Sequence, residues 1–363
     1  MKTLLLLFFI LLISPAKAVL DFEDHSFPEF VTSARALALG NAYLNKVDDS
    51  WSAFYNPAGL GTVRKPQFHI LNGHIEASSG LMDVIGDGPA SEVPGKFVDS
   101  FDVEDFRTEL AQHQGKLAHS RFNLFPNITV RGLTLGYFYS QRNRAIINDD
   151  VANNFEVAER RDQGPVMSLT ASLFGGILKV GATGLYLNRK QLYKSFGPTE
   201  PTVISDADYK KGSSFQLIAG TRLTLPWTLL PTFSAVLRNA TDSDFDGEAL
   251  QTPEPIEQTL DVGFSLTPQI GKRTRIHLEA NYKDVGNAYE TNTKRRFAAG
   301  AELDFNRRLF FRAGWGDGWG SGGLGVRTRT FILDLTTYAV DRARNGFREE
   351  EDRRWVISLS SGF

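Results

Sequence analysis

The side chains of this sequence that could support catalysis or bind a metal ion are its six histidines and a few paired carboxylates. His69 and His74 are the closest two histidines, and on a strand their odd separation places them on opposite faces, where they could not share a metal ion. The motifs G-x-S-x-G and H-E-x-x-H are absent. Asp206 and Asp208 are interpreted as solvated loop charges. We therefore expect no cofactor, no metal and no enzymatic activity; an enzyme with a Ser/His or paired-Asp site in its loops is the remote alternative.

The glycine-rich stretch GWGDGWGSGGLGVR, residues 314–327, has the composition of a phosphate-binding loop. Such a loop holds phosphate groups between the end of a strand and the start of a helix. No strand-then-helix pattern surrounds this stretch, so we do not expect a nucleotide site. Glycines within strands more often mark bends or close contact with another backbone.

The first 18 residues contain the three parts of a secretory signal peptide in the correct order. Lys2 precedes an apolar run from Leu4 to Ile13, and Ala16-Lys17-Ala18 matches a cleavage site. The run is too short to cross a bilayer as a helix, so we expect export with cleavage before Val19; a buried strand is the alternative. The chain has no cysteine and a net charge of −2, so we expect neither a lipoprotein nor a nucleic-acid partner.

Most of the remaining sequence alternates apolar and polar residues with the period of a β-strand. Between residues 273 and 283, one face carries the apolar side chains Ile276, Leu278, Ala280 and Tyr282. The pattern fits a soluble β-sandwich, with the apolar faces inside, and a membrane barrel, with the apolar faces outside. Alternation alone leaves both folds open.

The lengths of the connections distinguish these two folds. We predict strands near residues 65–75, 119–130, 132–141, 165–174, 177–189, 213–225, 229–240, 256–267, 273–285, 295–305, 308–316, 319–328, 330–342 and 353–363. Long connections, at 76–118, 142–164, 190–212 and 241–255, alternate with tight turns, and only the turn at Asp317-Gly318 departs from this order. The alternation is typical of outer-membrane barrels. The predicted fold is therefore all-β, a transmembrane antiparallel β-barrel of about 14 strands.

The end of the chain supports this fold. Trp355, Ile357, Leu359 and Phe363 share one face of the last strand, and Phe363 is the final residue. A terminal strand that ends in an aromatic residue resembles the signal that the barrel assembly machinery reads. We expect that machinery, outer-membrane lipid and lipopolysaccharide as the partners of a monomer.

Residues 19–64 precede the first strand and do not follow its pattern. They contain Gly40 in a run of small residues, the acidic pair Asp48 and Asp49, and the turn Asn56-Pro57-Ala58-Gly59, and the order of these features resembles the FadL-like family of outer-membrane transporters, in the broad sense that includes PorV-like barrels. The other matching positions are Ser33, Arg35, Ala36, Leu39, Ala42 and Leu60. The sequence departs from the family where Asn41 replaces a second glycine and where Lys46 replaces a small residue.

The resemblance implies an N-terminal hatch, residues 19–64, inside a barrel formed by residues 65–363. A barrel of this size has a lumen too wide for its own side chains to fill, and the small residues would let the hatch approach the wall. We expect Asn56 to Gly59 to end the hatch and redirect the chain into the first strand. Asp48 and Asp49 could pair with inward arginines or lie in a solvated turn; the candidate arginines are Arg222, Arg238, Arg275, Arg296 and Arg312.

The first long connection, 76–118, contains Phe97, Phe101, Phe106 and Leu110 near helical spacing. We expect a short amphipathic helix that caps the mouth, touches a ligand or packs on other loops. The family resemblance implies passive uptake of hydrophobic small molecules, long-chain fatty acids or similar compounds, across the bacterial outer membrane. It identifies no ligand-binding residue. The alternative is an outer-membrane scaffold of a secretion or surface-attachment system.

Overall fold

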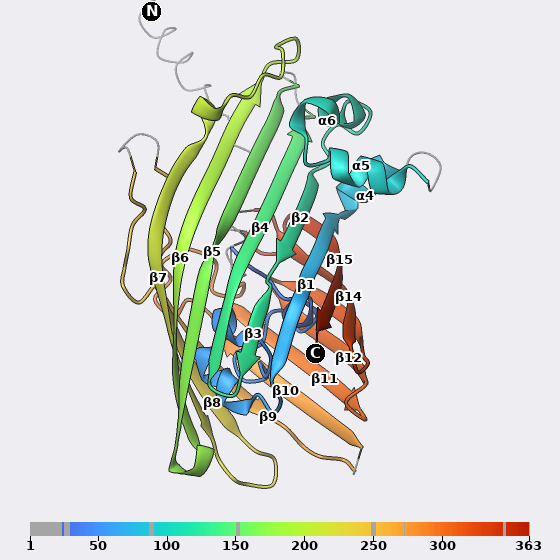
Figure 1. Ribbon diagram of the computed structural model, residues 1–363. Helices are drawn as coiled ribbons and strands as arrows, with labels where there is room; N and C mark the ends of the chain where they lie inside the picture. The colour runs from blue at the N-terminus through green and yellow to red at the C-terminus, as the bar shows by residue number, and fades with distance from the viewer. Residues whose placement is uncertain are drawn as a thin grey trace, which may run out of the picture.

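The computed structural model describes residues 24, 30–86, 91–149, 153–247, 252–271, 273–343 and 346–362, and it does not describe the side chains of 103–105. The predicted signal peptide, 1–18, and the terminal Phe363 lie outside the described residues. The described chain forms a closed antiparallel β-barrel with short helices inside it and at one end (Figure 1). This confirms the predicted fold class.

Fifteen strand segments form one sheet, in which each neighbouring pair is antiparallel and β15 returns to pair with β1. The segments are β1 (Gln67–Ser78), β2 (Ala118–Leu124), β3 (Asn127–Val130), β4 (Leu133–Ile147), β5 (Phe155–Leu173), β6 (Leu178–Phe196), β7 (Lys210–Thr224), β8 (Thr232–Arg238), β9 (Thr259–Leu266), β10 (Thr274–Tyr282), β11 (Phe297–Phe305), β12 (Leu309–Gly316), β13 (Trp319–Arg327), β14 (Phe331–Asp341) and β15 (Glu351–Gly362). β2 and β3 both lie between β1 and β4, so they are two halves of one barrel strand. The barrel therefore has 14 strand positions.

The break between β2 and β3 falls at Phe125 and Pro126. Proline has no N–H group to donate to a neighbouring strand. The Pro126 carbonyl still accepts the N–H of Tyr137, at 3.1 Å, and the Phe125 N–H donates to Asn72, at 2.8 Å. The two halves thus stay in line although the ladder is interrupted.

The two faces of the wall have opposite polarity, which separates this fold from a sandwich. Large apolar side chains are exposed on the outside, among them Leu135, Leu169, Phe233, Leu278 and Ile357. The residues next to them in sequence point inward and are buried and polar: Thr134, Ser168, Ser234, His277 and Ser358. An apolar outer belt around a polar interior is the pattern of a barrel in lipid. None of the helices in the described part of the chain is long and apolar enough to cross a membrane.

The barrel has one end with tight turns and one with longer connections, here called the tight-turn end and the long-loop end. At the tight-turn end, β5 and β6 are joined by η2 (Phe174–Gly176), and β11 and β12 by Asn306 and two further residues. At the long-loop end, the connection after β1 contains α4 (Ser79–Gly86), α5 (Val93–Asp99) and α6 (Val103–Leu110), and the connection after β6 contains η3 (Asp206–Asp208). The single helix expected around Phe97, Phe101, Phe106 and Leu110 is instead divided: Phe97 lies in α5, Phe106 and Leu110 lie in α6, and Phe101 lies between the two helices.

Four strands extend further than the sequence pattern indicates. β4 continues to Ile147 and β5 begins at Phe155, so the connection expected at 142–164 shortens to 148–154. β6 likewise continues to Phe196 and β7 begins at Lys210, within the expected connection 190–212. These strands rise beyond the rest of the wall toward the helices of the first connection (Figure 1).

The turn at Asp317-Gly318 is tight although it lies at the long-loop end. Both residues have positive φ, 52° and 85°, as a two-residue hairpin turn requires. Asp317 is buried and binds the Arg295 guanidinium and the N–H of Asp341, the latter at 2.8 Å. These bonds hold the turn against the end of β14. They stabilise a tight turn at the end of the barrel where the other connections are long.

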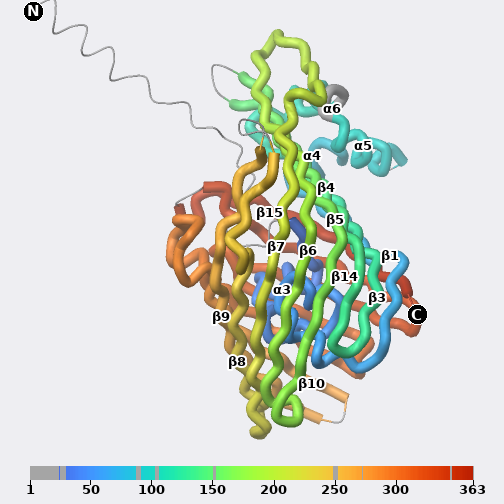
Figure 2. Tube along the Cα trace, turned by 60° about the vertical axis from the view of Figure 1, so that its left-hand side comes forward, coloured from blue at the N-terminus to red at the C-terminus, as the bar shows by residue number. Residues whose placement is uncertain are grey.

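The segment from Phe30 to Thr62, here called the hatch, lies inside the barrel (Figure 2). It contains α2 (Ala34–Ala38), α3 (Ser52–Tyr55) and η1 (Pro57–Thr62). α2 contacts β12, β13, β14 and β15, and η1 contacts β5, β6 and β7, on the opposite part of the wall. Almost every hatch residue from Phe30 to Gly61 is buried.

Candidate functional site: the hatch and the lumen

Asn56 connects the end of the hatch to the barrel wall. Its backbone is extended, with φ −156°, and its side-chain oxygen accepts the N–H of Ala58 at 3.1 Å, which caps η1. Its amide nitrogen donates to the carbonyls of Leu44, at 2.9 Å, and Thr221 of β7, at 3.3 Å. Pro57 occupies the first position of the 3-10 helix, where its missing N–H has no cost. The segment Asn56 to Gly59 thus lies at the corner between hatch and wall.

Glycines of β6 and β7 make room for this corner. A Cβ atom added to Gly181 would lie 2.6 Å from the Pro57 carbonyl carbon, and one added to Gly220 would lie 2.2 Å from the Asn56 side-chain oxygen. Gly59 is equally confined, with the Val47 carbonyl oxygen 2.6 Å from a Cβ at that position. A side chain at Gly181 or Gly220 would push the hatch from the wall, and one at Gly59 would disturb the packing within the hatch.

A second contact between hatch and wall lies on the opposite side, at the predicted residue Gly40. Gly40 has φ +63°, and a Cβ atom on it would lie 2.3 Å from the Trp315 carbonyl oxygen. On the wall, Cβ atoms at Gly314 and Gly300 would lie 2.2 Å from the Gly40 nitrogen and 2.6 Å from the Leu39 carbonyl oxygen. We call Gly300, Gly314 and Gly316 the glycine notch. Part of the glycine-rich stretch is thus explained by contact with the hatch.

The acidic pair of the hatch is held by Arg35, which is also in the hatch. The Arg35 guanidinium lies 2.7 Å from the Asp48 carboxylate and 3.3 Å from that of Asp49. It also forms two 2.9 Å bonds with Glu302 of β11. Glu302 in turn accepts a bond from Arg312, at 2.8 Å, and lies 3.2 Å from the Lys46 ammonium. The result is an ion network in which the wall supplies Glu302 and Arg312 and the hatch supplies Arg35, Lys46, Asp48 and Asp49.

This arrangement differs from the expected pairing of Asp48 and Asp49 with wall arginines. Arg238 instead pairs with Asp261, at 2.9 Å, and donates to the Phe54 carbonyl at 2.6 Å. Arg222 donates to the Val47 carbonyl at 3.5 Å. These wall arginines bind hatch carbonyls because the short helices of the hatch leave many carbonyls without an internal partner.

The lumen between the hatch and the long-loop end contains a second charged region, which the sequence reasoning missed. Asp24 lies near four arginines, with Arg354 at 2.8 Å, Arg142 at 3.3 Å, Arg121 at 3.5 Å and Arg144 in direct contact. Glu76 binds His119 and Tyr338, both at 2.7 Å. Arg142, Arg144 and Arg160 lie on inward faces of β4 and β5, so strand alternation was the signal that could have revealed them.

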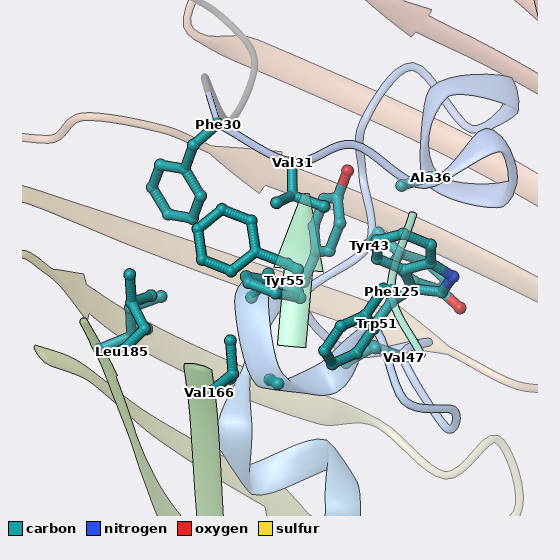
Figure 3. Packing of buried hydrophobic residues seen from close by; sticks show 14 of the residues in the cluster. Phe30, Val31, Ala36, Tyr43, Val47, Trp51, Tyr55, Phe125, Val166 and Leu185 are labelled. Atoms are coloured by element: carbon teal, nitrogen blue, oxygen red, sulfur yellow. The ribbon is translucent and has the colours of Figure 1, made fainter. Parts of the chain in front are cut away.

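An apolar stripe lies beside these charges, along the inner face of β4 to β8. Its wall residues are buried: Phe138, Val166, Leu185, Leu187, Ile218 and Val236. Hatch aromatics pack on it, with the Phe54 ring 5.0 Å from Phe125 and 5.7 Å from Phe138. Figure 3 shows Phe30, Trp51 and Tyr55 of the hatch beside Val166 and Leu185 of the wall. The stripe continues to Phe245 and Ile256, in the connection between β8 and β9.

The residues of the predicted assembly signal lie on the outside of β15. Trp355, Ile357 and Leu359 are exposed there, as lipid-facing side chains. Phe363, the fourth residue of that prediction, lies outside the described residues. The role of these residues in assembly therefore stays a prediction.

Comparison with known proteins identifies the fold. No protein-family model matches the sequence, and no curated protein matches it. Among solved structures, the chain is similar to the toluene transporter TodX of P. putida, with a TM-score of 0.51, 10% identity and coverage of 92% of this chain and 98% of that one. It is similar also to the toluene transporter TbuX of Ralstonia pickettii, with a TM-score of 0.52, 9% identity and the same coverage of 92% and 98%.

Proposed function

We propose that this protein is a bacterial outer-membrane barrel through which hydrophobic small molecules diffuse, with the hatch as the gate. The apolar stripe carries this proposal. Barrel interiors are ordinarily polar, whereas this one has buried apolar side chains along five strands, β4 to β8. The stripe runs from the β8–β9 connection to the hatch corner, so an apolar molecule could bind along it. Each Å² of apolar surface that is removed from water contributes about 25 cal/mol of binding free energy.

The position of the hatch supports a gating role. Its aromatic side chains Phe30 and Phe54 occupy the stripe, so a ligand could pass only if they moved. The hatch contacts the wall at the corner around Asn56 and at the glycine notch. None of its described residues belongs to a strand of the barrel sheet. Similarity in fold to two toluene transporters is compatible with this function. The proposal contains no chemical step.

For the substrate, we propose aromatic hydrocarbons or long-chain fatty acids. The test is uptake of labelled toluene, xylene, palmitate and oleate by a strain that lacks the gene and by the same strain carrying it on a plasmid. We expect uptake of at least one compound to fall several-fold without the gene and to recover with it. Uptake of a small sugar should not change. Equal uptake of all four hydrophobic compounds in both strains would contradict the proposal.

A scaffold is the second candidate, and one observation favours it. The long ends of β4 to β7 and the helices α4 to α6 form a projection beyond the rest of the wall (Figure 1). Its interior is a separate apolar cluster that includes Leu81, Phe106, Phe155 and Phe196, so it has its own packed core. Such a projection could present a rigid surface to another protein. Unchanged uptake, together with loss of a surface-attached protein in the deletion strain, would favour this function.

A further inference from the structure

A cavity of about 470 Å³ opens at the tight-turn end of the barrel, next to the hatch; we call it the vestibule. Arg35, Lys46 and Asp48 of the hatch line one side of it. The other sides come from the residues before and at the start of β1, the β11–β12 and β13–β14 turns, and the end of β15. Its volume is typical of sites for small organic molecules.

The vestibule contains an excess of positive charge. Eight lysine and arginine side chains line it, against two carboxylates. Arg35 and Lys46 are bound to Asp48 and Glu302 in the ion network of the hatch. The six cations that remain are Arg64, Lys65, Arg275, Arg307, Arg327 and Arg329. Within the described part of the chain, these six form no ion pair.

The second carboxylate, Asp304, does not neutralise them. It lies opposite Arg275 in the register of β10 and β11. Its side chain accepts the backbone N–H of Arg307, at 2.7 Å. The eight cations of the vestibule thus outnumber its two carboxylates, Asp48 and Asp304, in a protein whose net charge is −2.

Three other inward arginines of the wall have acidic partners. Arg312 pairs with Glu302 at 2.8 Å, Arg189 with Asp162 at 2.7 Å, and Arg354 with Asp352 at 2.8 Å. Charges buried in the lumen need such partners because desolvation is costly. The vestibule differs from these three pairs, because its six unpaired cations lie together at an opening to solvent, where like charges repel one another and attract anions.

We propose that the vestibule binds a phosphate-bearing molecule. Five of its six cations are arginines, whose planar guanidinium groups match phosphate oxygens in pairs. A phosphate monoester carries up to two charges and three acceptor oxygens, so it neutralises the cluster better than a single carboxylate does. Phe310 and Ile332 also line the cavity and can contact the organic part of the molecule.

The phosphate has two possible sources, a phospholipid headgroup at the membrane surface or a soluble phosphate ester. The outward side chains beside these turns, Phe305 and Phe331, are exposed and apolar, so the vestibule lies near the edge of the lipid-facing belt. The proposal does not depend on transport of hydrophobic molecules, and its test measures binding alone.

The experiment compares the whole protein with a triple variant, Arg307→Gln, Arg327→Gln and Arg329→Gln. The matched control is Lys116→Gln, Lys210→Gln and Lys211→Gln, which makes the same change in net charge at exposed positions of the long-loop end. Calorimetry in dodecyl maltoside measures binding of inorganic phosphate and glycerol 3-phosphate. Native mass spectrometry after extraction from nanodiscs measures retained phosphatidylglycerol. A heat-dependent shift in gel mobility verifies that each barrel is folded.

We expect binding in at least one of the two measurements, weaker by about tenfold for each arginine removed and unchanged in the control. Binding of phosphatidylglycerol alone identifies the headgroup as the source, and binding of glycerol 3-phosphate alone identifies a soluble ester. Absence of binding in both, or equal loss in the control, would overturn the proposal. If the triple variant does not fold, the pair Arg307→Gln and Arg329→Gln, both on exposed turns, replaces it with the same criteria.

Discussion

At the centre of the hatch, the guanidinium of Arg35 binds three carboxylates that would otherwise repel one another. Asp48 and Asp49 approach it from the hatch and Glu302 from the wall. Glu302 has no exposed side-chain area and the Arg35 side chain is 6% exposed, so water contributes little to their solvation. Removing one partner of such a buried pair leaves an uncompensated charge, which costs more than the pair itself contributes.

Arg35→Ala should therefore lower the free energy of unfolding by about 3–5 kcal/mol. Arg35→Lys should lower it less, because lysine keeps the charge but cannot bind Glu302 through two parallel bonds. The measurement is urea unfolding in liposomes, followed by tryptophan fluorescence. In the double variant Arg35→Ala with Glu302→Gln, part of the loss should be recovered. If the two single losses simply add, the Arg35–Glu302 contact contributes nothing to stability.

The sequence placed part of this network in the hatch and left its pairing open. Asp48 and Asp49 were expected either to pair with an inward arginine such as Arg312 or to lie in a solvated turn, and Glu302 was not among the expected partners. Which arginine meets which carboxylate depends on how α2 and the Asp48 turn fold back on each other across 13 residues. No local pattern encodes that distance. Asn56 was easier to place, since an extended residue before a proline and a capping side chain are both local properties.

At the scale of elements, the glycine notch fixes how closely the hatch approaches β11 and β12. The approach is between two backbones, so neither side can move aside as a flexible side chain would. Across the lumen, Gly181 and Gly220 accept the Asn56 corner in the same way. Both contacts between the hatch and the wall are therefore possible only because the wall has glycine at these positions.

Gly314→Ala should displace the hatch and open the lumen to ions. The new Cβ atom would lie 2.2 Å from the Gly40 nitrogen, whereas at Gly320, in the neighbouring strand β13, it would meet nothing within 4 Å. In planar bilayers we expect Gly314→Ala to raise single-channel conductance several-fold over wild type, and Gly320→Ala to leave it unchanged. Deletion of residues 19–62 should give the highest conductance of the series, because a barrel of this width without a plug is an aqueous channel. If that deletion conducts no better than wild type, the hatch does not close the pore.

Strands inside the membrane were predictable because lipid on one face and a polar lumen on the other impose alternation. Each of the 14 predicted strands overlaps an observed one. The extensions of β4 to β7 were missed because water surrounds them and removes the requirement for apolar residues on the outer face. Arg142, Arg160 and Lys194 lie in these extensions, where charged residues make strand alternation a weaker signal than it is in the lipid-facing wall.

At the scale of the molecule, the two ends of the barrel differ in shape and in charge. The long-loop end has the projection with its own apolar core, and the tight-turn end has the vestibule with six cations. In outer-membrane barrels, tight turns face the periplasm and long connections face the exterior. The proposed outer-membrane location therefore assigns the projection to the cell surface and the vestibule to the periplasm.

This orientation can be tested cleanly because the chain has no cysteine of its own. Gly95→Cys in α5 and Gly271→Cys in the β9–β10 turn are matched positions, since both are exposed and a Cβ atom at either meets nothing within 4 Å. On intact cells, a membrane-impermeant maleimide should label Gly95→Cys fully and Gly271→Cys hardly at all. Permeabilising the outer membrane should make the two equal. Labelling of Gly271→Cys alone on intact cells would show that the barrel has the opposite orientation. The vestibule would then face the medium, where it could not bind phospholipid of the inner leaflet.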